Sequence, residues 1–194
     1  MNPRRPIVVK GYVPLVLALV LAGCASPSGS SSGGAGTGEP NVYVAREAAG
    51  IDKVGILPFK AATSLVGTSV SDMFVTEVMK MDRYELVERS QMSGVLGETE
   101  VALSGLTAGQ AARLGQMVGA NGVIIGTVSE YETVALGGRT YPVVGITVRL
   151  IDSSTGKILW SVDHAERGPR NGTLAEHARD VVRTMAEALD RQLR

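Results

Sequence analysis

Apolar and polar residues alternate with a period of two over much of the second half of the chain, which is typical of β-strands. In the clearest example, Ile146 and Val148 fall on one face, while Thr147 and Arg149 fall on the other. This alternation predicts a strand with one face on a core and the other toward water or a partner. Short connections between such strands predict an antiparallel meander. Its strands are expected at 122–131, 144–152 and 157–164, with turns at Gly137-Gly138 and 152–156.

Apolar residues recur at spacings of three and four in other segments, which predicts amphipathic helices over 64–81, 108–118 and 173–193. Thr107 and Gln110 have the spacing of a capping box, and Gly119 is typical of a left-handed C-terminal cap. Ser90 is expected to cap a shorter helix over 91–96. The helix after Thr107 is expected to bury Ala111, Ala112, Leu114, Met117 and Val118.

Two short apolar segments nearer the N-terminus, 53–59 and 84–89, predict further strands. Pro58 has no main-chain N–H, so the first of these strands is expected to end there or to be locally unpaired. The segment 41–50 fits a short edge strand, an extended arm or a poor helix, and we expect a partly ordered lead-in. Together these elements predict a single α/β domain, in which a mixed sheet with an antiparallel meander is packed by helices.

The first residues of the chain predict export. Arg4, Arg5 and Lys10 precede an apolar run of about 11 residues that ends at Ala22, whereas a helix needs about 20 residues to span a bilayer. A basic start, a short apolar run and small residues are the layout of a secretory signal.

The segment Leu21-Ala22-Gly23-Cys24 resembles the lipobox of bacterial lipoproteins. The resemblance implies that a signal peptidase recognises Leu21, Ala22 and Gly23 and cuts before Cys24. It also implies that acyl chains such as palmitate are attached to Cys24. The alternative is an ordinary signal peptide followed by an unremarkable cysteine.

Residues 25–40 read ASPSGSSSGGAGTGEP, a low-complexity segment that cannot bury enough apolar surface to fold. As a flexible coil it spans roughly 20–24 Å, enough to hold a domain just off a membrane. The expected organisation is therefore a signal peptide over 1–23, a lipidated cysteine and tether over 24–40, and a folded periplasmic domain over 41–194.

Composition and charge narrow the possible functions. The 194 residues are 44% apolar but only 4% aromatic, so the core is expected to consist of aliphatic side chains and Met. Loss of residues 1–23 removes three basic residues and no acidic one, which leaves 16 basic against 19 acidic residues. A clustered basic surface is needed to bind nucleic acid, so no nucleic-acid partner is expected. The only cysteine is Cys24, so no disulfide is expected either.

The motifs of several kinds of catalytic and binding site are missing. There is no G-x-x-x-x-G-K-[ST] loop for phosphates, no G-x-S-x-G nucleophile and no H-E-x-x-H pair. His164 and His177 fall on different predicted elements, and Asp72 and Glu77 are expected on a solvated helix face. Trp160 is expected to be a core or sheet-edge aromatic rather than a platform for a ligand. We therefore predict no catalytic residue, no metal and no cofactor, and hence no enzyme.

Several segments together resemble the CsgG family of curli-secretion lipoproteins. They are VGILPF, SDMFVTEVMKMDRYELVERSQMSGVLGETE, SGL, GANGVIIGTVSEYE and VRLIDSSTGKILWS. The resemblance covers residues 53 to about 164. It implies an α/β domain similar to an anticodon-binding domain and carried on a lipid anchor, a fold that the penicillin-binding-protein activator LpoB also resembles.

The resemblance to the family's pore-forming member implies two long amphipathic hairpins that insert into the outer membrane. A membrane-spanning strand needs about 9–11 residues. Here the connection 130–143 is expected to be only a turn, and the chain after Trp160 runs through charged residues into a Gly/Pro break. Neither place is expected to hold a membrane hairpin, and no pore residue is transferred.

The expected function is that of a non-enzymatic binding or assembly component of the cell envelope. The protein would be anchored by lipid at the periplasmic face of the outer membrane. An Asp after the lipidated cysteine indicates retention in the inner membrane of enteric bacteria, and here Ala25 follows Cys24. Its partner would be an envelope protein or further copies of the chain. One alternative is an LpoB-like activator of a penicillin-binding protein, and a second is a subunit of an oligomeric secretion channel.

Overall fold

The computed structural model describes residues 38–96 and 105–194. Leu21, Ala22, Gly23, Cys24 and most of the tether lie outside these residues, as does most of the loop expected before Thr107. The described strands are β1 (Asn41–Val44), β2 (Lys53–Ile56), β3 (Glu85–Val87), β4 (Gly122–Leu136), β5 (Arg139–Asp152) and β6 (Ile158–Arg167). The helices are η1, a 3-10 helix (Arg46–Gly50), α1 (Ser64–Lys80), α2 (Arg89–Leu96), α3 (Ala108–Met117) and α4 (Leu174–Leu193).

Within the described residues the strands form one mixed sheet in the order β1-β6-β5-β4-β2-β3. The neighbours β4, β5 and β6 are antiparallel and form the expected meander, whereas β2 is parallel to both β3 and β4. β1 pairs antiparallel with β6. The segment 41–50, for which the sequence left several structures open, is therefore a short edge strand followed by η1. The expected mixed α/β fold is confirmed.

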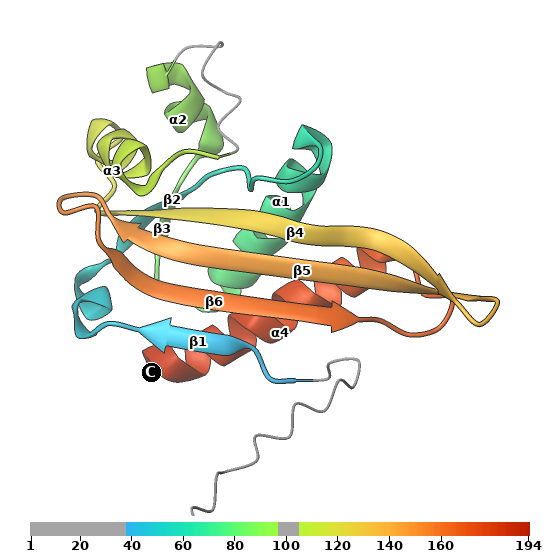
Figure 1. Cartoon of the computed structure of the whole chain (residues 1–194). Coiled ribbons are helices and arrows are strands. Elements are labelled where there is room, and N and C mark those ends of the chain that lie inside the picture. The colour runs from blue at the N-terminus through green and yellow to red at the C-terminus, as the bar shows by residue number, and fades with distance from the viewer. Residues whose placement is uncertain (1–37, 97–104) are drawn as a thin grey trace, which may run out of the picture. The chain divides into compact units, whose positions relative to one another are not determined.

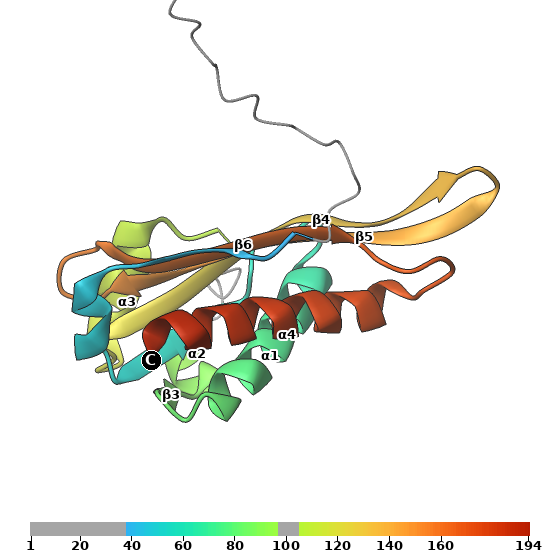
Figure 2. The ribbon, with the colours of Figure 1, turned by 90° about the horizontal axis from the view of Figure 1, so that it is seen from below.

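Helices cover the two faces of the sheet unequally. α1 and α4 lie side by side on one face of the sheet, and their apolar stripes form the main core with the central strands (Figures 1 and 2). α3 packs on the other face near β4 and, together with Met92 of α2, forms a smaller core. The rest of that second face, across β1, β6 and much of β5, is left without a helix in Figure 1.

Trp160 lies at the centre of the main core, as expected, and is fully buried. Its ring lies 6.5 Å from that of Phe74, which lies 5.8 Å from that of Phe59. α1 approaches the chain after β2 very closely, since a Cβ at Gly67 would lie 1.9 Å from the Phe59 carbonyl oxygen. Only glycine fits at this crossing.

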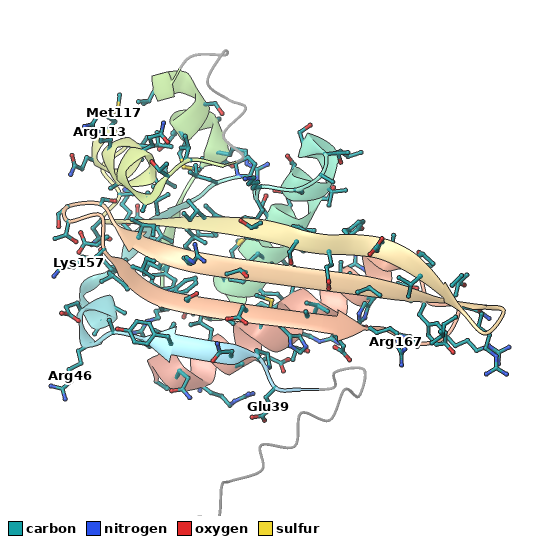
Figure 3. All side chains as sticks on the ribbon, viewed as in Figure 1. Glu39, Arg46, Arg113, Met117, Lys157 and Arg167 are labelled. Carbon is teal, nitrogen blue, oxygen red and sulfur yellow. The ribbon has the colours of Figure 1, made fainter. Side chains whose placement is uncertain are left out.

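Most predicted helix ends are confirmed. Thr107 and Gln110 form a complete capping box, and Gly119 has the expected positive φ of 67°. Two details of the predicted helices were wrong. α2 already begins at Arg89, so Ser90 lies inside the helix, and Met117 is 60% exposed (Figure 3).

The segment 130–143 differs most from expectation. It is not a simple turn, because β4 continues to Leu136, β5 begins at Arg139, and only Gly137-Gly138 connects them. These glycines have φ values of 58° and 72°, as a two-residue hairpin turn with the sheet's twist requires. The hairpin β4–β5 reaches beyond α4 (Figure 2).

Among the described residues, no helix has the length and apolar character needed to cross a membrane.

Candidate functional site

A groove with a volume of about 590 Å³ lies beside β3, the edge strand of the sheet. Its walls come from α1, from the turn before β3, and from the start of α2. Its apolar lining consists of Ile56, Val75, Met79, Tyr84, Leu86 and Val87, and its charged rim consists of Asp72, Asp82, Glu88 and Arg89. We call this feature the β3 groove.

Helical spacing places the α1 side chains of the groove in one row. Asp72, Val75 and Met79 follow one another at intervals of three and four residues, so they share one face of the helix. Met79 is 64% exposed although it is apolar. An exposed apolar side chain inside a groove provides contact area for another molecule.

The turn after α1 carries a carboxylate to the rim. Asp82 has a positive φ of 50°, a conformation that asparagine and aspartate tolerate better than most residues. The N–H of Asp82 donates to the carbonyl of Met79, which closes the end of the helix. Asp82 therefore belongs to the turn that leads from α1 to the edge strand.

Arg89 ties the start of α2 to α1. Its Nη2 lies 2.5 Å from Asp72 Oδ1 and 3.2 Å from the hydroxyl of the fully buried Ser71. Its Nε is buried without a hydrogen-bond partner among the described residues. Because one guanidinium faces three carboxylates, the rim of the β3 groove is acidic.

Tyr84 connects the groove to the core. Its hydroxyl accepts a hydrogen bond from Trp160 Nε1 at 3.2 Å. Burial raises the pKa of Tyr84, while the bond from Trp160 and the nearby Arg83 act in the opposite direction. Tyr84 is therefore a neutral, fixed wall of the groove at physiological pH.

The free edge of β3 adds main-chain groups to the site. The N–H of Glu85 donates to the Asp52 carbonyl at 2.7 Å, so Glu85 and Val87 direct their main-chain groups toward β2. Main-chain groups alternate in direction along a strand, so those of Leu86 point away from β2. The site thus combines an apolar surface, an acidic rim and an open sheet edge.

The structure brings the two histidines close to one residue, Glu166. His164 Nε2 lies 3.4 Å from Glu166 Oε2, and His177 Nε2 lies 2.9 Å from the Glu166 carbonyl oxygen. Both histidines are buried. The part of the chain that the structure describes holds no group of three or more His, Cys, Asp or Glu side chains placed to bind a metal.

Asp72 and Glu77 were both predicted on a solvated face. The side chain of Asp72 is 56% exposed, as predicted, but that of Glu77 is only 12% exposed, so the prediction was wrong for Glu77. Glu77 pairs with Lys80 of the same helix at 2.7 Å, while Asp72 pairs with Arg89 across the groove. The segment LVER, residues 86–89, was predicted only as part of a strand and of the family resemblance. Its side chains form a wall of the β3 groove, and this was missed because the opposite wall comes from α1.

The sequence of the chain matches the model of the family described as "Curli production assembly/transport component CsgG" over residues 42–179. The chain belongs to the CsgG family. The match begins in β1 and ends in the second turn of α4, so it includes most of β1, all of β2 to β6 and the β3 groove. The expected family is confirmed, and the resemblance extends beyond the segments from which it was inferred.

Two solved structures of PelC share the fold of this chain. A PelC dodecamer from Paraburkholderia phytofirmans is 19% identical, with a TM-score of 0.54, and the match covers 75% of this chain and 92% of PelC. Its L103M variant is 20% identical, with a TM-score of 0.55, over 81% and 99% of the two chains. The LpoB C-terminal domain from Escherichia coli is 19% identical, with a TM-score of 0.43, over 59% and 81%. No curated protein sequence matches the chain.

Proposed function

We propose that this CsgG-family protein is a lipoprotein of the bacterial envelope that acts without catalysis, by binding and assembly. Cys24 carries the lipid, residues 25–40 form the tether, and the domain 41–194 faces the periplasm at the outer membrane. In this proposal the protein forms a homo-oligomer. The PelC dodecamers, which share its fold, support this.

The open β3 groove is the observation that carries the proposal. An apolar groove beside an unpaired sheet edge is suited to hold a polypeptide, because main-chain hydrogen bonds and apolar contacts are both provided. The sheet face without a helix over β1, β6 and β5 offers further surface for protein contacts. Both features suit a protein that holds other chains in place.

The mass of the protein extracted from membranes tests this proposal. Full-length protein, processed by the cell, is extracted in mild detergent and its mass is measured by light scattering with correction for detergent. We expect a defined assembly of several copies. A single copy at concentrations near those in the membrane would contradict the homo-oligomer.

A subunit of a secretion channel is the second candidate, and the β4–β5 hairpin favours it. Past the bulge between Val128 and Glu130, the strands continue to pair as far as Leu136 and Arg139. However, Glu130 to Leu136 is only seven positions, fewer than the roughly 9–11 of a membrane-spanning strand. Purified protein added to planar lipid bilayers tests this candidate, since a channel would produce stepwise conductance.

A further inference from the structure

We infer that the β3 groove of one copy receives strand β1 of the next copy, so that the sheets of neighbouring subunits join into one. This inference rests on the proposed homo-oligomer and names the surfaces that form it. Four features of the structure support it: free main-chain groups, strand direction, side-chain faces and charge.

β1 has free main-chain groups along its outer edge. The N–H of Ala45 donates to the Leu159 carbonyl of β6 at 2.7 Å, so Ala45, Tyr43 and Asn41 direct their groups toward β6. Those of Val42 and Val44 therefore point outward. At the other end of the sheet, Leu86 is the residue of β3 whose groups point outward. Each copy thus has two complementary open edges.

Strand direction allows the two edges to pair. β2 is parallel to β3 and β4, and β5 runs opposite to β4. β6 runs opposite to β5, and β1 runs opposite to β6. β1 is therefore antiparallel to β3. Copies arranged side by side with their strands in the same orientation would join β1 to β3 as an antiparallel pair.

The side chains of the two edges also face the same way. Val42, Val44 and Leu86 are partly buried and pack against the main core, on the face that α1 and α4 cover. When two outward-directed residues pair, their side chains lie on the same face of the joined sheet. Val42 and Val44 of one copy would therefore meet the exposed apolar row of α1 in the next, including Met79.

Charge favours this orientation of the copies. Arg46 is the second residue after β1 and projects away from the domain (Figure 3). It makes no ion pair with any residue in 38–96 or 105–194. The rim of the β3 groove carries Asp82 and Glu88 in addition to the Asp72–Arg89 pair. An antiparallel β1 strand at this edge brings Arg46 to the Asp82 end of this acidic rim.

Because the two contacting surfaces differ, the interface is heterologous. Such contacts generate closed rings when the rotation between copies closes, and open filaments when it does not. Each added copy leaves one β1 edge and one β3 groove unpaired until a ring closes. The joined sheet therefore accounts for an assembly of many copies from one type of contact.

Cysteine cross-linking tests the arrangement directly. Tyr43 and Glu85 both have exposed side chains on edge strands and direct their main-chain groups inward, so they belong to the same face of the joined sheet. In detergent-extracted full-length protein, Tyr43→Cys combined with Glu85→Cys should give a ladder of multimers with a short bismaleimide. Co-expressed single variants should stop at cross-linked dimers, and either variant alone should give none.

Charge reversal provides a second measurement that does not depend on cross-linking. Arg46→Glu should weaken assembly at least about tenfold, because it places like charges at the groove. Asp82→Arg in the same chain should restore it, because antiparallel pairing of β1 with β3 sets Arg46 opposite the Asp82 end of the rim. Arg179→Glu is the matched control and should leave assembly unchanged. Arg179 lies near the start of α4, whereas Arg46 lies near the residues at its end.

The outcomes separate this inference from the proposed function. An oligomer in which the two introduced cysteines do not cross-link, and which is unaffected by Arg46→Glu, would overturn the inference and leave the homo-oligomer intact. Cross-linking of the Glu85→Cys variant to a different protein in the envelope would also overturn it. A wild-type protein that is a single copy would contradict both.

Discussion

Trp160 and Tyr84 are joined by a hydrogen bond although 76 positions separate them in the sequence. The indole Nε1 donates to the tyrosine hydroxyl at 3.2 Å. Trp160 lies in β6, in the meander, while Tyr84 precedes β3 at the opposite edge of the sheet. The bond therefore fixes a wall of the β3 groove to the centre of the core.

Tyr84→Phe should destabilise the domain by about 1–3 kcal/mol, because it leaves the buried indole N–H without an acceptor. Chemical denaturation followed by tryptophan fluorescence measures this, since Trp160 is the only tryptophan. Tyr43→Phe, at an exposed position, is the control and should have little effect on unfolding. Equal stability of the two variants would show that the bond is not important.

Gly67→Ala should destabilise the domain by several kcal/mol. The added Cβ would lie 1.9 Å from the Phe59 carbonyl oxygen, so the main chain of α1 would have to move away from that of Phe59. Gly94→Ala in α2 is the matched control, because nothing lies within 4 Å of its Cβ position. That control should stabilise its helix by roughly 0.5–1 kcal/mol. Thermal unfolding of both variants measures the difference.

The turn between β5 and β6 should make a small contribution to stability that depends on pH. The hydrogen bond from the Ser154 hydroxyl, together with main-chain N–H groups of Ser154 and Thr155, lowers the pKa of Asp152 below its ordinary value of 3.8. A lowered folded-state pKa means that the stabilisation is fully present above the ordinary value. It is lost as pH falls through the lowered value.

Asp152→Asn removes the titrating group and keeps an oxygen that can accept these hydrogen bonds. The variant should therefore lose stability less steeply than wild type as pH falls below about 4. Urea unfolding between pH 2 and pH 6 measures the two slopes. Identical slopes would mean that Asp152 titrates alike in the folded and unfolded chains. Because Asp152 remains partly accessible to solvent, we expect a modest effect.

The β4–β5 turn should discriminate between alanine and asparagine. Gly138 has a φ of 72°, where alanine costs about 1–2 kcal/mol and asparagine costs less. Gly138→Ala should therefore speed hydrogen exchange of the amides in 130–143, whereas Gly138→Asn should have a smaller effect. Mass spectrometry of peptides from this segment measures the rates. Similar exchange in both variants would contradict the observed turn.

Features set by neighbouring residues could be predicted from the sequence. The capping box at Thr107 and Gln110 depends on residues three apart, and the α4 stripe depends only on helical spacing. Met117 was wrongly predicted to be buried, because its spacing of three residues from Leu114 places it at the border of the narrow apolar face of α3. α3 packs through Ala111 and Gly115, which turns Met117 toward solvent.

The hairpin over 130–143 could not be predicted from apolar alternation, because many of its residues are exposed on both faces. Main-chain pairing holds it together, and the chain after β6 supports it. The N–H groups of Gly168 and Asn171 donate to the carbonyls of Pro142 and Thr140, both at 2.8 Å. The apolar–polar pattern predicts a strand where apolar side chains are buried. It gives no signal where only main-chain hydrogen bonds hold two strands together.

The β3 groove depends on distant segments and therefore left no local signal. Its walls are 72–79 and 84–89, which meet only because β3 pairs with β2 beneath α1. The sequence of each wall predicts a helix or a strand, not a shared surface. The acidic rim could not be predicted either, because Asp72, Asp82 and Glu88 come from different elements and surround one opening only in the folded chain.

The anchor at Cys24 is the part of this account that can be tested most directly. Wild-type protein and Cys24→Ser are produced in a Gram-negative host, and envelope fractions are compared by immunoblot after washing with high salt and carbonate. We predict that the wild type remains with the outer membrane and that Cys24→Ser is released into the soluble periplasmic fraction. A Cys24→Ser protein that stays in the outer membrane as firmly as the wild type would contradict the account.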